Sequence, residues 1–102
     1  MSKFEVAAAA IKKSGESGSK MTDDELLQIY GLYKQSTAGD NGNPQPEDAN
    51  AKAKHDAWLA NKGLSKQEAE DKYVALSVGL LTKYNVDVPE ALKWLSQQIL
   101  SI

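Results

Sequence analysis

The sequence predicts an all-α fold, a bundle of four or five helices. Three capping boxes mark helix starts, at Ser2–Glu5, Thr22–Glu25 and Ser65–Glu68. Each begins with a side chain that can cap a free backbone N–H and ends with a glutamate that reaches back. Apolar residues recur at helical spacing after them. The sequence has no alternating strand pattern, no repeat of fixed period and no low-complexity tract.

The first half of the chain contains two of these helices. Residues 3–13 are rich in alanine, carry one apolar stripe and end at a Ser- and Gly-rich loop, 14–19. Residues 23–37 carry an apolar stripe as well, which predicts an amphipathic helix. Glycine, asparagine and proline then predict a long loop over residues 38–48.

Three further helical segments follow. Residues 49–62 are expected to form a helix that ends before Gly63, a residue suited to the left-handed backbone after a helix. The helix expected over 66–84 has two apolar ridges, which implies two neighbours. A capping Asp87, a first-turn proline and a clean apolar stripe predict a fifth helix over 88–102. We expect this fifth helix to pack on the second ridge of the fourth, formed by Val74, Val78 and Leu81.

Composition limits the class of protein. With 102 residues and 11.1 kDa the chain makes one domain. It has no cysteine, which excludes a disulfide scaffold and thiolate chemistry and is compatible with a reducing compartment. Twelve lysines against fourteen acidic residues give a net charge of −2, which argues against binding nucleic acid by charge. The longest apolar run, Val6–Ile11, is too short for a membrane helix, and the N-terminus has no secretory pattern.

Recognisable catalytic and metal-binding patterns are absent from the sequence. The single histidine, His55, has no second histidine or cysteine with which to hold a metal, so we interpret it as a surface or rim residue. No nucleophile elbow, P-loop or dinucleotide-binding loop occurs. The acidic run Asp23–Glu25 is explained by the positive end of a helix dipole.

One helical stretch carries groups suited to a ligand. Tyr30, Tyr33 and Lys34 share a helix face, so two rings and an ammonium could recognise a planar base that carries a phosphate. A glycine inside a helix costs about 1 kcal/mol, and Gly31 therefore suggests that something approaches the backbone closely there. The alternative from spacing alone is that the tyrosines are core residues and the lysine is solvated. The same two interpretations apply to Lys54, Trp58 and Tyr73.

Three motifs occur in a set order along the chain. They are Tyr-Gly-Leu-Tyr-Lys-Gln-Ser-Thr-Ala-Gly-Asp at 30–40, Lys-Ala-Lys-His-Asp-Ala-Trp at 52–58, and the helix that starts at Ser65 and contains Tyr73. In this order and register they resemble the acyl-CoA-binding protein family, and the resemblance covers residues 2–85.

The resemblance implies a four-helix up-and-down bundle that is not an enzyme. Proteins of this family bind long-chain fatty acyl-CoA thioesters, protect them and carry them between membranes and enzymes. We therefore expect a cytoplasmic monomer that holds acyl-CoA as its ligand, uses no cofactor or metal, binds no nucleic acid, and touches membranes or acyl-CoA-using enzymes only transiently. Residues 1–86 would form the acyl-CoA-binding domain. Residues 87–102 would form a helical extension packed on it.

The resemblance also assigns roles to individual residues. By position, the adenine and its ribose 3′-phosphate would be held by tyrosines and lysines, with the neighbouring backbone lining the same stretch. These predicted ligand residues are Lys12, Tyr30, Gly31, Leu32, Tyr33, Lys34, Lys54 and Tyr73. The acyl chain would lie in a groove between helices, with Met21, Leu26 and Ile29 as wall residues.

The sequence departs from the family pattern at several points. His55 stands where many members have a tryptophan, the loop after the first helix is longer, and the loop between the second and third helices is shorter. Two other functions are alternatives: a helical adaptor that grips a partner protein with its Tyr/Trp/Lys face, and an enzyme that consumes acyl-CoA. The enzyme would need a general base near the thioester, for which the chain offers His55 and scattered carboxylates.

Overall fold

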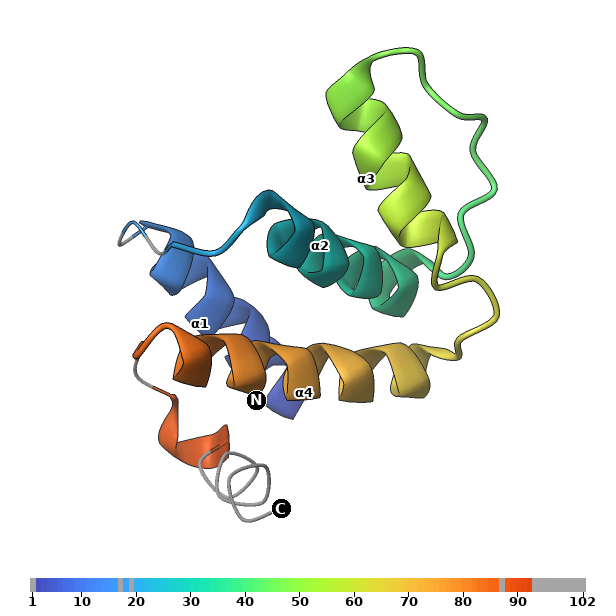
Figure 1. The fold of residues 1–102 in the computed structure, drawn as a ribbon. Helices are drawn as coiled ribbons and strands as arrows, with labels where there is room; N and C mark the ends of the chain where they lie inside the picture. The colour runs from blue at the N-terminus through green and yellow to red at the C-terminus, as the bar shows by residue number, and fades with distance from the viewer. Residues whose placement is uncertain (1, 17, 19, 87, 93–102) are drawn as a thin grey trace. The chain divides into compact units, whose positions relative to one another are not determined.

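The computed structural model describes residues 2–16, 18, 20–86 and 88–92. This part of the chain contains α-helices and one 3-10 turn, and no strand (Figure 1). The elements are α1 (Lys3–Glu16), α2 (Asp23–Ala38), α3 (Ala49–Leu59), α4 (Lys66–Lys83) and the turn η1 (Glu90–Leu92). The predicted all-α class is therefore confirmed. None of the helices described is long and apolar enough to cross a membrane.

The helices begin where the capping boxes predict. At the start of α2, the Glu25 N–H donates to Thr22 Oγ1 at 3.2 Å and the Thr22 N–H donates to the Glu25 carboxylate at 2.8 Å. The same reciprocal bonds join Ser65 and Glu68 at the start of α4, both at 3.1 Å. Both helices thus have two of their unpaired N-terminal groups satisfied by side chains from their own first turn.

The helix ends follow the predictions less closely. The first helix continues to Glu16 and includes Ser14, which is 3% exposed. The third ends at Leu59, short of the predicted Lys62, because the following N–H groups bond three residues back, such as Asn61 to the Trp58 carbonyl. This tightening replaces the last turn of an α-helix.

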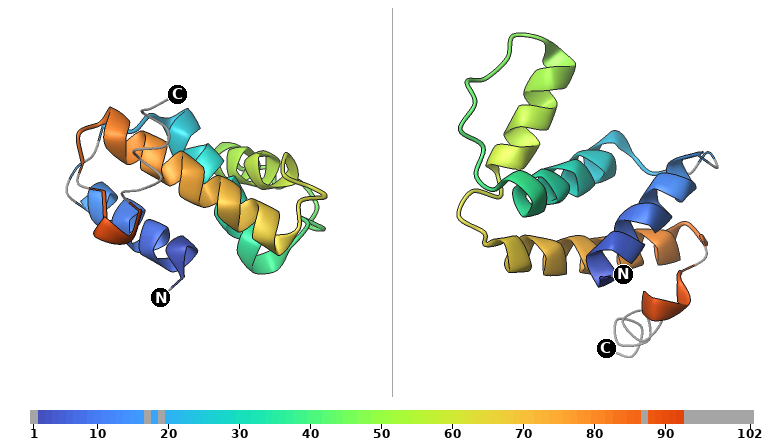
Figure 2. Two further views of the ribbon diagram at one scale, coloured as in Figure 1. Left: turned by 90° about the horizontal axis from the view of Figure 1, so that it is seen from below. Right: turned by 180° about the vertical axis from the view of Figure 1, so that it is seen from behind.

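The chain divides into two compact units, Met1–Met21 with Tyr73–Ile102, and Thr22–Lys72. In the first unit, the ring of Phe4 on α1 meets that of Tyr73 on α4 edge-to-face, with centroids 5.0 Å apart. The turn η1 packs against α1 (Figure 2) and its Leu92 has no exposed surface.

The predicted fifth helix requires a correction where the structure describes it. Val88 and Pro89 are not helical, and the only regular structure in residues 88–92 is the 3-10 turn, closed by the Leu92 N–H on the Pro89 carbonyl. A residue before proline is biased away from helical backbone, which explains why Val88 does not start a helix. Asp87 and residues 93–102 of the predicted helix lie outside the described residues. The described contact of this segment is with α1, and packing on the second ridge of α4 stays a prediction.

In the second unit, α2 packs against α3 (Figure 1). Gly31 of α2 lies against Ala57 of α3, and Gln35, one turn later, donates to the Leu64 carbonyl beyond the end of α3 at 3.0 Å. The two helices therefore run parallel along their contact. In the predicted up-and-down order, consecutive helices are antiparallel. α2 and α3 depart from this order because the loop 39–48 runs back along the length of α3 before that helix begins.

Leu92 should anchor the segment that follows α4. Truncating a fully buried leucine costs about 2–5 kcal/mol, and we expect Leu92→Ala to lower the melting temperature by several degrees or more, at about 4–8 °C per kcal/mol. The matched control is Leu59→Ala, because Leu59 is 40% exposed. Thermal unfolding followed by circular dichroism tests this, and equal melting temperatures for the two variants would contradict the anchoring role.

Candidate ligand site

The backbones of α2 and α3 approach each other at Gly31. A Cβ atom on this residue would stand 2.3 Å from the Ala57 carbonyl oxygen and 2.8 Å from the Asn61 side-chain amide. Both distances are shorter than van der Waals contact, so only glycine fits. The close approach that the sequence predicts at this position is made by α3.

Two lysines cross this helix contact in opposite directions. The Nζ atom of Lys34, on α2, lies 4.9 Å from the centroid of the Trp58 ring on α3. The Nζ atom of Lys54, on α3, lies 5.8 Å from the centroid of the Tyr30 ring on α2. Both distances are within the range of a cation–π attraction. We call these two contacts the crossed lysine–aromatic pairs.

The ring of Trp58 is itself held in place. Its indole N–H donates to the Gly39 carbonyl at 2.7 Å, which fixes the indole nitrogen on the first residue after α2. From spacing alone, Trp58 is either a ligand contact or a core residue, and it is not among the predicted ligand residues. A signal was present, however: Tyr30 and Lys34 are four residues apart on one helix, as are Lys54 and Trp58 on the next, so each helix presents an aromatic ring and a lysine on one face.

The loop 39–48 is tied to α3 along its length. Besides the Trp58 bond, the Asn41 amide donates to the His55 carbonyl at 3.1 Å, and the Gln45 amide donates to the Asp56 carboxylate at 3.0 Å. His55 Nε2 lies 2.8 Å from the Asn43 carbonyl oxygen. The loop that carries the chain from α2 to α3 is thereby fixed beside the crossed pairs.

His55 lies between two hydrogen-bond acceptors. Its Nε2 faces the Asn43 carbonyl and its Nδ1 lies 3.1 Å from the Asp56 carboxylate, while its side chain is only 10% exposed. The Asn43 carbonyl, and secondarily Asp56, raise the pKa of His55 above its ordinary value of 6.5. The pKa of Asp56 is lowered, chiefly by the Gln45 amide and then by His55. The doubly protonated imidazolium can donate to both acceptors at once.

The end of α2 is joined to the segment after α3 by Asp40. Its carboxylate accepts from the Gly63 N–H at 2.9 Å and from the Gln35 amide at 2.8 Å. These two bonds, that from Gly63 first, lower the pKa of Asp40. Gly63 has φ +94°, the left-handed backbone expected there, and this conformation allows its N–H to reach the carboxylate.

The predicted site residues fall in both units. The second unit contains Tyr30, Lys34 and Lys54 of the crossed pairs. It also contains Tyr33, 42% exposed, and the buried Leu32 on the same helix. Of the predicted groove residues it holds Leu26, 44% exposed, and Ile29, 7% exposed.

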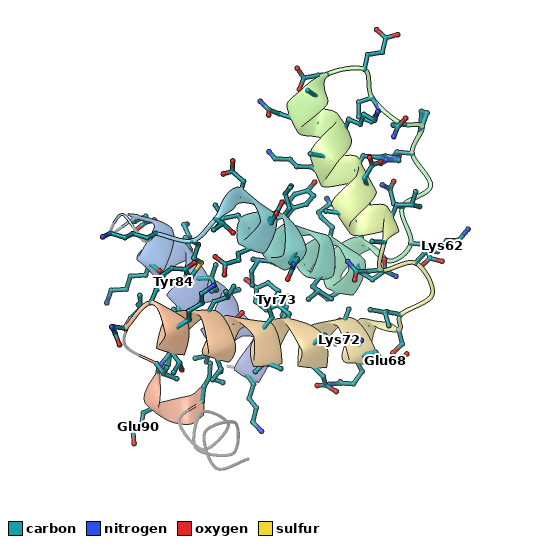
Figure 3. The ribbon with its side chains drawn as sticks, viewed as in Figure 1. Lys62, Glu68, Lys72, Tyr73, Tyr84 and Glu90 are labelled. Atoms are coloured by element: carbon teal, nitrogen blue, oxygen red, sulfur yellow. The ribbon has the colours of Figure 1, made fainter. Side chains whose placement is uncertain are left out.

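The first unit holds the remaining predicted residues. Lys12 is exposed on α1, Met21 is largely buried, and Tyr73 is 2% exposed on α4 (Figure 3). Their approach to the crossed pairs stays a prediction. This unit also has a cavity of about 410 Å³, lined by residues that sequence analysis did not single out as ligand contacts: Gly18, Lys20, Lys83, Tyr84, Asn85 and Val86. No group of three or more potential metal ligands occurs in the part of the chain that the structure covers.

Comparison with known proteins identifies the family. The sequence profile described as "Acyl CoA binding protein" matches residues 1–77. The chain belongs to the acyl-CoA-binding protein family. An "Acyl-CoA-binding protein" of Dictyostelium discoideum is 50% identical over 86 residues, which cover 82% of this chain and 99% of that protein. The "Acyl-CoA-binding protein homolog 1" of Caenorhabditis elegans is 46% identical over 83 residues, 79% of this chain and 93% of that protein.

Solved structures of acyl-CoA-binding proteins have the same fold. The crystal structure of ACBP from Moniliophthora perniciosa matches with a TM-score of 0.76 and 34% identity, over 100% of this chain and 98% of that one. The crystal structure of Oryza sativa Acyl-CoA-Binding Protein 2 matches with a TM-score of 0.71 and 28% identity, over 86% of this chain and 100% of that one. The resemblance seen in the motifs is therefore confirmed by sequence and by fold.

Gly31→Ala should separate α2 from α3. The added Cβ overlaps the Ala57 backbone, which cannot move as a flexible side chain could, and overpacking of this kind costs about 1–3 kcal/mol. The matched control is Gly79→Ala on α4, where a Cβ meets nothing within 4 Å and the change should be neutral or stabilising. Chemical denaturation of both variants tests this, and an unchanged free energy of unfolding for Gly31→Ala would show that the helices are not in backbone contact.

The free energy of unfolding should depend on pH through His55. Because the pKa is raised in the folded protein, the stabilisation is fully present below the unfolded-state value of about 6.5 and is lost as pH rises through the folded-state pKa. We expect the advantage of the wild type over His55→Gln to be larger at about pH 5.5 than at about pH 8.5 in urea unfolding.

The titration of His55 can also be followed directly by NMR, since it is the only histidine in the chain. Its midpoint should lie above 6.5 in the folded protein. A midpoint at or below that value would contradict the assignment of the two acceptors.

Proposed function

We propose that this protein binds long-chain fatty acyl-CoA thioesters and carries them, without catalysing a reaction. The observation that supports this most is the pair of lysines that the α2–α3 contact brings to aromatic rings within one unit. Ammonium groups held beside aromatic rings are suited to a nucleotide that carries phosphates. Membership of the family, whose relatives are named acyl-CoA-binding proteins, supports the same ligand.

The nucleotide end of the ligand would occupy the α2–α3 face. In this proposal Tyr30 and Tyr33 supply ring surface and hydroxyl groups, and Lys34 and Lys54 supply charge to phosphate. Gly31 and Leu32 line the same stretch of helix. Lys12 and Tyr73 are assigned to the ligand by their match to the family pattern, and binding measurements on their variants are the test of that assignment.

The acyl chain would contribute most of the binding energy. A palmitoyl chain brings about 14 methylenes, and at about 0.8 kcal/mol each their full burial yields about 11 kcal/mol before ordering costs. Leu26 is 44% exposed, which leaves apolar surface available to such a chain. Met21 and Ile29 are proposed as neighbouring wall residues of the groove.

The remaining proposals concern the protein as a whole. Residues 1–86 would form the binding domain and 87–102 an extension of it. The protein would act as a monomer in the cytoplasm, without cofactor, metal or nucleic acid, and would touch membranes or acyl-CoA-using enzymes only when it loads or delivers its ligand. A helical adaptor function is less well supported, because the family relatives carry the name of a ligand rather than of a protein partner.

Isothermal titration calorimetry with palmitoyl-CoA, free CoA and palmitate tests the function. We expect palmitoyl-CoA to bind far more tightly than either part alone, because the headgroup and chain contributions combine in one molecule. Lys34→Ala should weaken palmitoyl-CoA binding about tenfold, or about 1.4 kcal/mol, through loss of a phosphate partner.

The control for this substitution is Lys52→Ala, which removes an exposed lysine of α3 two residues before Lys54. Its affinity should match that of the wild type. Equal affinity of the wild type for palmitoyl-CoA and free CoA would rule out the acyl groove. Full affinity in Lys34→Ala would rule out the phosphate role of this lysine.

A further inference from the structure

We infer that Trp58 is a positioning residue for Lys34: its indole face holds the lysine ammonium in the place from which it binds the phosphate of the nucleotide. The inference rests on the proposed function and adds a residue that is not among the proposed ligand contacts.

A lysine on a helix surface is normally mobile, and fixing it has a cost. Its side chain loses about 1.5–2 kcal/mol of rotamer freedom when it is held in one conformation. Lys34 is already held in the structure, since its Nζ lies 4.9 Å from the centre of the Trp58 ring and its side chain is half-buried. Part of the ordering that a phosphate would require is therefore complete before the ligand arrives.

The nature of the partner matters as much as its position. A carboxylate beside Lys34 would neutralise its charge and compete with phosphate for its three N–H donors. An aromatic face attracts the ammonium through its quadrupole but carries no net charge. The described contact thus holds the lysine in place and leaves its full positive charge for an anion.

The Trp58 ring is held at two points. Its backbone belongs to α3, which is locked against α2 at Gly31 and Ala57. Its indole nitrogen is bound to the Gly39 carbonyl at 2.7 Å. The ring therefore has a defined place relative to the helix that carries Lys34.

A pair of matched variants isolates the aromatic face. Trp58→Phe and Trp58→Met both remove the indole N–H and its bond to Gly39, and only the phenylalanine retains a ring. We expect Trp58→Met to bind palmitoyl-CoA about threefold to tenfold more weakly than Trp58→Phe in calorimetry, as the loss of a cation–π contact predicts. In a Lys34→Ala background the two variants should bind equally, because the ring then has no ammonium to hold.

NMR of the ligand-free protein gives a separate readout. The ε-methylene protons of Lys34 should be shifted upfield by the ring current in the wild type and in Trp58→Phe, and not in Trp58→Met. Absence of binding by the wild type would overturn the proposed function, and this inference with it. If the wild type binds, three results overturn the inference alone: equal affinity of the two variants, tighter binding by Trp58→Met, or a difference that persists in the Lys34→Ala background.

Discussion

The second unit depends on the contact between the backbone of α2 at Gly31 and the backbone of α3 at Ala57. At this separation no Cβ atom fits between the helices. The long side chains on either side of the contact can therefore reach across to the opposite helix, and the crossed lysine–aromatic pairs follow from it. A wider helix packing would leave these ammonium groups in solvent, where a cation–π attraction is weak.

Much of the fold follows from local patterns, and these were predictable from the sequence. The capping boxes at Thr22 and Ser65 predict the residue at which each helix starts, because their hydrogen bonds join groups only three positions apart. Helix ends depend more on residues that are distant in sequence. α3 ends at Leu59 rather than at Lys62, and the segment after it is bonded through Gly63 to Asp40, a residue distant in sequence. Pro89 is compatible with the first turn of a helix, but it also disfavours helical backbone at the residue before it, and Val88 is not helical in the structure.

The candidate site, like the fold, was predictable from the sequence only in part. Because a glycine destabilises the helix that contains it, Gly31 indicates a close approach to the backbone. Only the structure identifies Ala57 as the neighbour. The contact between Trp58 and Lys34 was not predictable because the two residues lie on different helices. The parallel course of α2 and α3, which brings them together, is set by the loop 39–48. The bonds that hold this loop, such as Asn41 to the His55 carbonyl, pair residues that no short motif relates.

The division of the chain into two units also bears on how it acquires its structure. The second unit, Thr22–Lys72, is continuous in sequence, so its contacts close only short loops of chain. The first unit joins the N-terminal helix to residues from Tyr73 onward, and its Phe4–Tyr73 ring contact closes most of the domain into one loop. The entropic cost of loop closure rises with loop length. α2 and α3, which carry the crossed lysine–aromatic pairs, therefore cost less entropy to assemble than the first unit does. During synthesis on a ribosome they are also complete while the partner of the N-terminal helix has yet to emerge.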